Sequence, residues 1–119
     1  MGLKTRNKHL PDLLVLYDEG RLSGNAHRKV LDKFSKYQLL ILDEWLIDEL
    51  SEMERSFIFE LIERRHDQGA TIFCSQFRTT DWHGRLGGGV AADAILDRII
   101  HNAISIETGQ INMREYRAK

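Results

Sequence analysis

Apolar residues in this chain recur either at helical spacing or in short unbroken runs. Apolar positions three and four apart predict helices at residues 10–20, 27–34, 52–66 and 91–101. Unbroken apolar runs predict strands at residues 39–42, 70–74 and 103–106, and a fourth strand is expected at 111–116. Since unbroken rather than alternating apolarity is typical of strands buried on both faces, this order predicts an α/β fold with a mostly parallel sheet.

Each predicted helix has one apolar face and recognisable ends. Ser51 followed by Glu54 predicts a capping box, and Gly20 and Gly69 are expected to end helices. The basic residues 64–66 suit the negative end of the helix that they close. The residues expected to face inward are Leu13, Leu14, Leu16, Tyr17, Val30, Leu31, Phe34, Met53, Phe57, Ile58, Leu61, Ile62, Ile95, Leu96, Ile99 and Ile100.

Length and composition exclude several classes of protein. A chain of 119 residues fits one domain with a real hydrophobic core. No apolar run approaches the roughly 18 residues of a membrane span, and no secretory signal is visible, so we expect no membrane contact. The single cysteine, Cys74, suits a reducing cytoplasm and lies in an apolar run, where a core role is expected. The five histidines do not have zinc-site spacing.

Charge is unevenly distributed along the chain. Residues 1–36 carry a net charge of +4, whereas residues 43–63 carry eight acidic and one basic residue. The basic first segment, with Lys4, Arg6, Lys8 and His9, could contact DNA, and the alternative is a solvated tail. The acidic segment is of more interest because it begins with two adjacent carboxylates.

Asp43 and Glu44 carry the strongest chemical signal. They directly follow the apolar run 39–42, so they are expected at the carboxyl end of a buried strand, where α/β sheets bind ligands. One carboxylate can hold Mg²⁺ and the next can activate a water that attacks a phosphate, which is the Walker B arrangement of P-loop ATPases. The alternative is a buried strand that ends in two solvated acids.

Ser75 ends the next predicted strand. In ATPases of the AAA+ class, a small polar residue at this place contacts the γ-phosphate or the attacking water. Ser75 is therefore a candidate sensor residue, and the alternative is a helix cap or a turn residue.

These motifs fall in a familiar order with four further strings: Thr71-Ile72, Ser75-Gln76, Asp81-Trp82-His83 and residues 92–98, Ala-Asp-Ala-Ile-Leu-Asp-Arg. The sequence resembles the insertion-sequence ATP-binding proteins of the IstB type, which are relatives of the DnaC helicase loader. The resemblance runs from about Leu10 to Arg114, nearly the whole chain. It implies a three-layer, P-loop NTPase-type (AAA+) parallel sheet flanked by helices.

The resemblance also implies roles for single residues. Asp43 would bind Mg²⁺, Glu44 would activate water and Ser75 would be the sensor. Arg98 stands where the family has its arginine finger, which acts on ATP held by a neighbouring subunit; a surface arginine is the alternative. Arg114 would be a second arginine facing the phosphates, although Ile111 and Asn112 depart from the usual family ending.

The phosphate-binding loop, Gly-x-x-x-x-Gly-Lys-Ser/Thr, does not occur in these 119 residues. In the family it lies upstream, so residues 1–119 resemble the C-terminal portion of an AAA+ domain, from Walker B to the arginine finger. The sheet would then be incomplete, because the loop's strand normally lies between the sensor strand and the last strand. We therefore expect weak or no Mg-ATP binding by this chain, and either self-association or movement of residues 111–116 into the vacant place.

Two classes of function follow. In the first, the chain is part of an ATP-dependent transposition accessory protein that assembles as a homo-oligomer on DNA and helps a transposase to act. A helicase-loader role is a variant of this class. In the second, the chain is a non-catalytic interaction module or a remnant. ATP and Mg²⁺ are the cofactors that the first class implies.

Overall fold

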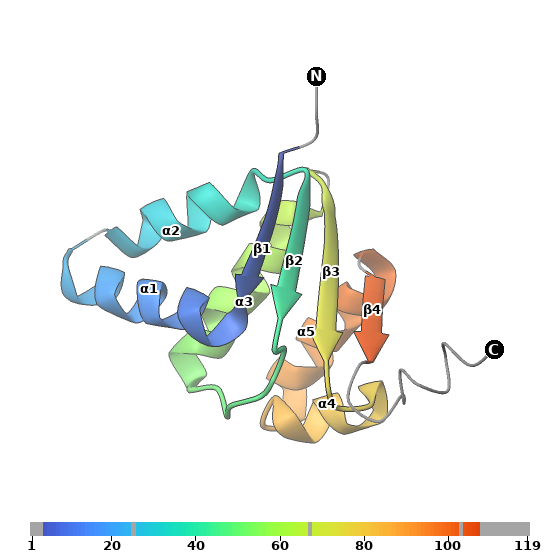
Figure 1. Ribbon diagram of the computed structural model, residues 1–119. Helices are drawn as coiled ribbons and strands as arrows, with labels where there is room; N and C mark the ends of the chain where they lie inside the picture. The colour runs from blue at the N-terminus through green and yellow to red at the C-terminus, as the bar shows by residue number, and fades with distance from the viewer. Residues whose placement is uncertain (1–3, 25, 67, 103, 108–119) are drawn as a thin grey trace.

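The computed structural model describes residues 4–24, 26–66, 68–102 and 104–107. They form one sheet of four parallel strands in the order β1-β2-β3-β4 (Figure 1). The strands are β1 (Thr5–His9), β2 (Leu39–Asp43), β3 (Ala70–Ser75) and β4 (Ile104–Glu107). The helices are α1 (Leu10–Leu22), α2 (Ala26–Ser35), α3 (Glu52–Arg65), α4 (Thr79–Arg85) and α5 (Gly89–Asn102). The predicted α/β fold with a parallel sheet is confirmed.

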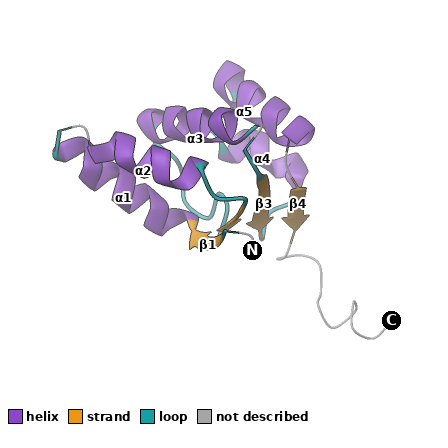
Figure 2. Ribbon diagram, turned by 90° about the horizontal axis from the view of Figure 1, so that it is seen from above, coloured by secondary structure: helices purple, strands orange, loops and turns teal. Residues whose placement is uncertain are grey.

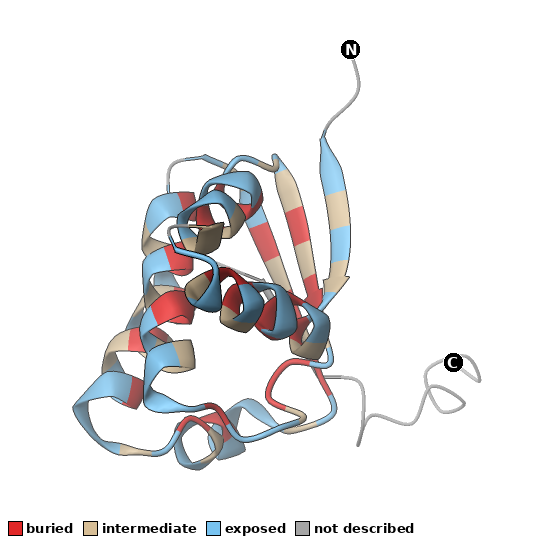
Figure 3. Cartoon of the chain, turned by 90° about the vertical axis from the view of Figure 1, so that its left-hand side faces the viewer, coloured by how far each residue is buried: buried red, intermediate tan, exposed pale blue. Residues whose placement is uncertain are grey.

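The described helices lie on one side of the sheet (Figures 2 and 3). Leu40, Leu42 and Phe73 point to this side and are fully buried, whereas Leu39 and Ile41 on the other side are only partly buried. The expectation that β2 is buried on both faces is therefore wrong for the described residues. Among these residues no second helical layer covers the other face.

The hydrophobic core lies between this covered face and the helices. Trp45 packs edge-on against Phe73 and Trp82, and Tyr17 stacks on Phe57. Three residues that were expected to face inward are instead exposed: Leu16 (36%), Met53 (50%) and Ile100 (76%). They have helical spacing, but they lie on sides of α1, α3 and α5 that the described core does not reach.

Strand β4 pairs directly with β3, and Ile72 lies opposite Ile104. The described sheet therefore has no gap between the strand that ends in Ser75 and the last strand. Its edges are β1 and β4, and such edges expose backbone groups that can pair with another chain. Residues 111–116 lie outside the described residues, and self-association stays a prediction.

Strand β1 replaces the solvated tail that was the alternative for the basic first segment. Lys8 and His9 pair with Leu42 and Asp43 in the parallel register. The polar sequence of β1 fits an edge strand, which needs only one neighbour.

Helix α3 begins as predicted. The Ser51 hydroxyl accepts a hydrogen bond from the Glu54 amide at 3.1 Å, and the Glu54 carboxylate accepts one from the Ser51 amide at 2.8 Å. This reciprocal capping box is confirmed.

Gly20 does not end α1, which continues to Leu22. A Cβ atom at Gly20 would lie 2.7 Å from the backbone nitrogen of His27, at the start of α2. Glycine is therefore needed here for the close approach of two helices.

We expect Gly20→Ala to destabilise the fold by about 1 to 3 kcal/mol, because overpacking against backbone outweighs the better helix propensity of alanine. Gly84→Ala is the matched control, since a Cβ at Gly84 in α4 meets nothing within 4 Å. It should be neutral or stabilising. Urea unfolding followed by circular dichroism measures both, and equal stability of the two variants would contradict the close-approach interpretation.

Candidate functional site

The candidate site is a small hollow at the carboxyl ends of β2 and β3. It has a volume of about 90 Å³. Its lining residues come from the end of β2 and the segment after it, and from the end of β3: Asp43, Glu44, Trp45, Ile47, Cys74 and Gln76. The structure thus places the predicted Asp43–Glu44 pair at the edge of the sheet where the sequence located it.

The backbone that follows Asp43 makes a sharp turn. Glu44 and Leu46 have positive φ angles of 55° and 63°, which non-glycine residues rarely adopt. The turn is held by a hydrogen bond from the Trp45 amide to the Cys74 carbonyl at 2.9 Å. Arg85 also holds it, because its guanidinium donates to the carbonyls of Leu46 and Ile47 at 2.7 and 2.8 Å. Such restraint is typical of positions where strain serves a function.

Asp43 and Glu44 have different surroundings. One oxygen of the half-buried Asp43 carboxylate accepts a hydrogen bond from the Glu44 amide at 3.0 Å. The exposed Glu44 carboxylate lies 2.7 Å from Nδ1 of His9, the last residue of β1. Sequence reasoning missed His9 as part of this site, because it missed β1.

Ser75 is buried, and its hydroxyl has partners within the protein. It donates to the Trp45 carbonyl at 2.9 Å and accepts from the Phe77 amide at 3.0 Å. This geometry is that of a turn residue, which was the alternative for Ser75. The next residue, Gln76, follows β3, is exposed and lines the hollow, and the sequence analysis assigned it no role of its own.

Cys74 also lines the hollow. Burial raises the pKa of its thiol, and the negative charge of Asp43 raises that pKa further. Both effects disfavour the thiolate, so the site does not activate Cys74 as a nucleophile.

The carboxylates at the hollow can supply only one or two of the ligands of a magnesium ion, so phosphates and waters would have to supply the rest. Among the residues that the structure describes, no group of three or more acidic, histidine or cysteine side chains could hold a metal ion. Mg²⁺ in nucleotide sites needs only one or two carboxylates, since phosphates and waters complete its shell. The Asp43 carboxylate has a second oxygen that would serve this purpose.

Arg98 lies on α5, away from the hollow's lining residues. Its Nε donates to the Glu63 carboxylate on α3 at 2.8 Å, and its guanidinium also approaches Asp97 at 3.5 Å. The structure therefore does not bring Arg98 together with Asp43 and Glu44 within one chain. A role towards a neighbouring subunit stays a prediction, and Arg114 lies outside the described residues.

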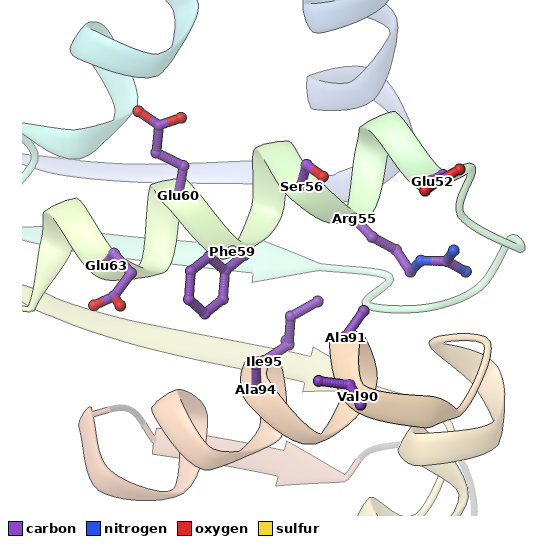
Figure 4. Close-up of a pocket in the computed structure, with 10 residues that line it drawn as sticks. All are labelled: Glu52, Arg55, Ser56, Phe59, Glu60, Glu63, Val90, Ala91, Ala94 and Ile95. Atoms are coloured by element: carbon purple, nitrogen blue, oxygen red, sulfur yellow. The ribbon is translucent and has the colours of Figure 1, made fainter.

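A larger groove of about 500 Å³ lies between α3 and α5 (Figure 4). Phe59 and Ile95 form part of its apolar lining, and Glu52 and Arg55 lie near one end of it. It shares no residue with the hollow at Asp43, so size alone does not identify the candidate site.

Comparison with known proteins decides the family. The IstB-like ATP binding protein family matches residues 1–119. The chain belongs to this family. Membership and the parallel sheet together confirm the predicted P-loop NTPase type of α/β fold.

Three named relatives support the assignment. The insertion sequence ATP-binding protein y4pL of Sinorhizobium fredii is 42% identical over 69% of this chain and 34% of its own length. The protein y4uH of the same organism is 32% identical over 91% of this chain and 43% of its own. The IS21 ATP-binding protein of Pseudomonas aeruginosa is 33% identical over 80% of this chain and 35% of its own. The chain thus spans less than half the length of these relatives.

The described helices were also compared with the requirements of a membrane span. Within residues 4–24, 26–66, 68–102 and 104–107, none combines the length and apolarity needed to cross a bilayer.

Proposed function

We propose that this chain supplies the magnesium- and water-handling part of an ATPase site in a transposition accessory protein. The observation that carries the proposal is the Asp43–Glu44 pair at the end of β2, facing a hollow that β3 completes with Gln76. Family membership supports nucleotide binding, and the relatives' names place them in insertion sequences.

The residues of the hollow divide the chemistry between them. Asp43 would hold Mg²⁺, which supplies charge neutralisation for the phosphates. Glu44 would orient the attacking water and take its proton. Ser75 would fix the turn that joins the ends of β2 and β3, and Gln76 would hydrogen bond to the water or to a phosphate oxygen. The remaining phosphate contacts belong to a phosphate-binding loop, which these 119 residues do not contain.

Asp43→Asn tests the metal role. In a form of the protein that includes a phosphate-binding loop, we expect this variant to lose at least tenfold in Mg-ATP affinity, because a neutral amide is a much poorer magnesium ligand. Affinity for ATP in the presence of EDTA should stay the same. Calorimetry with and without Mg²⁺ measures both. An equal loss under the two conditions would contradict a metal role for Asp43.

The wider role is that of an oligomer that assembles on DNA with Mg-ATP and assists a transposase. Arg98 would complete the ATP site of a neighbouring subunit, since it stands at the family's finger position and its side chain is partly exposed beside Glu63. A protein that neither binds duplex DNA in a salt-dependent way nor turns over ATP would instead belong to the non-catalytic class.

A further inference from the structure

We propose that Arg85 is a positioning residue, which acts through the backbone of the turn after β2 to keep the Glu44 carboxylate at the hollow. This inference rests on the proposed function, because it concerns the carboxylate that would activate water. Arg85 is the last residue of α4 and is not among the residues that line the hollow. Its effect is therefore indirect and passes through the contacts of its guanidinium.

The guanidinium of Arg85 holds the turn by two carbonyl groups. Its Nε and one terminal nitrogen donate to the Leu46 carbonyl at 3.0 and 2.7 Å. The same terminal nitrogen donates to the Ile47 carbonyl at 2.8 Å. The Ile47 amide in turn donates to the Glu44 carbonyl at 3.2 Å. A short chain of hydrogen bonds thus connects Arg85 to the backbone of Glu44.

The turn needs this support because its backbone conformation is unfavourable. Glu44 and Leu46 both have positive φ angles, where Cβ crowds the neighbouring carbonyl oxygen. The Leu46 side chain is fully buried, so the core holds its side chain while Arg85 holds its carbonyl. Without the guanidinium, the turn is expected to relax towards negative φ angles. A change of φ at Glu44 re-aims its Cβ and therefore moves the carboxylate.

Arg85 also contacts the segment that follows β3. Its guanidinium carbon lies 4.0 Å from the centre of the Phe77 ring. The Phe77 carbonyl accepts a hydrogen bond at 3.0 Å from the indole of Trp82, which also lies on α4. Phe77 directly follows Gln76, which lines the hollow from the β3 side. Arg85 thus touches the segments that carry Glu44 and Gln76, and it fixes their separation across the hollow.

A guanidinium suits this task better than an ammonium group. Its planar fork donates to two carbonyls and still presents a face to the Phe77 ring. Within the described ranges no acidic side chain pairs with Arg85, so its charge is directed at backbone dipoles and an aromatic ring. Lysine at this position keeps the charge but only part of these contacts.

The first test uses the chain as it stands. The Trp45 amide donates to the Cys74 carbonyl at 2.9 Å, so its hydrogen exchange reports opening of the turn. We expect Arg85→Met to speed exchange of this amide at least fivefold relative to the amides of α3, and Arg85→Lys to speed it less. Arg78→Met is the matched control, because Arg78 is an exposed arginine directly before α4. Equal exchange in Arg85→Met and the parent would overturn the restraint.

The second test measures turnover in a form of the protein that includes a phosphate-binding loop. We expect Arg85→Met to lower kcat for ATP by roughly ten- to a hundredfold, because misplacement of a reacting group by about 1 Å has such an effect. KM should stay within about twofold, since Asp43 belongs to β2 and precedes the turn. Arg85→Lys should recover part of kcat, and Arg78→Met should match the parent.

Two further variants keep the test decisive. Phe77→Leu removes the aromatic ring but not the apolar packing, so it should lower kcat by a smaller factor even if Arg85→Met does not fold. In the Glu44→Gln background, adding Arg85→Met should change the residual turnover less than twofold, because Arg85 acts through Glu44.

The outcomes separate this inference from the proposed function. Suppose first that Glu44→Gln alone lowers turnover at least a hundredfold. A further tenfold loss in the double variant would then overturn the positioning role but keep the proposed function. Parent values of kcat in both Arg85→Lys and Phe77→Leu would do the same. Turnover at the parent rate in Glu44→Gln would overturn both.

Discussion

Replacing Arg65 by methionine is expected to lower the free energy of unfolding by about 3 to 5 kcal/mol. The Arg65 side chain is 2% exposed, and no acidic partner accompanies it among the residues that the structure describes. Instead its guanidinium donates to backbone carbonyls at the end of α2 and the start of β3, and to the Thr71 hydroxyl at 2.7 Å. Methionine fills a similar volume but leaves these buried carbonyls without a donor.

Burial also lowers the pKa of the Arg65 guanidinium below its usual range, which agrees with a charge held only by dipoles. Arg65→Lys should recover part of the loss, because one ammonium group satisfies fewer of the carbonyls. Arg64→Met is the matched control. Its neighbouring guanidinium is exposed, pairs with Asp32 and Glu60, and should cost less than about 1 kcal/mol.

Urea unfolding followed by circular dichroism gives the three free energies. A domain of this size is commonly stable by only about 5 to 15 kcal/mol, so Arg65→Met could be largely unfolded at 37 °C. If Arg65→Met lowered the free energy of unfolding no more than Arg64→Met does, the hydrogen bonds from Arg65 to the buried carbonyls would contribute little to stability. The buried side chain would then stabilise the fold only by packing.

Arg65 also shows where a sequence pattern can be misread. The sequence analysis assigned residues 64–66 together to the negative end of the helix and gave Arg65 no separate role. Arg65, however, follows the buried Leu61 and Ile62 by four and three positions, so it continues the apolar face of α3. That spacing was a usable signal. What the sequence could not show is the set of carbonyls that receives the charge, because those of Phe34 and Tyr37 lie about thirty residues earlier in the chain.

The fold was predictable where apolar patterns are strong. The buried strand β2, the capped helix α3 and the strand β4 all lie where the sequence located them. Strand β1 has no apolar alternation, and Trp82 is the only buried residue of α4, so neither element leaves a pattern to read. Met53 and Ile100 follow the apolar pattern but are exposed. Periodicity predicts which residues share a helix face, but it does not predict whether another element covers that face.

Some residues of the candidate site could likewise be predicted from the sequence, and others could not. Asp43 and Glu44 were predictable because two acids follow directly after an apolar run, and strand ends carry ligand sites in sheets of this kind. His9 and Gln76 were not, since their place beside these acids depends on which strands are neighbours. Arg98 was found through resemblance to a family, and its contact with Glu63 could only come from the packing of α5 on α3.

Glu44→Gln is expected to lower ATP turnover by at least a hundredfold and to leave Mg-ATP binding within about threefold of the parent value. Glutamine has nearly the same shape and keeps an oxygen at the place that contacts His9. It removes the negative charge, so it cannot take a proton from water. The hydrogen bonds described for the turn come from its backbone and from Arg85, so a change in the Glu44 side chain should not disturb the turn.

Phosphate release and calorimetry, on a form of the protein that includes a phosphate-binding loop, separate the two effects. Glu49→Gln controls for charge, since Glu49 is an exposed acid of the same loop outside the hollow's lining. Comparison with Asp43→Asn then separates the roles of the two acids. Asp43→Asn should lose magnesium-dependent binding of ATP, whereas Glu44→Gln should lose turnover and keep binding. If Glu44→Gln turned over ATP at the parent rate, the water would be activated elsewhere, and Gln76 would be the next polar side chain of the hollow to test.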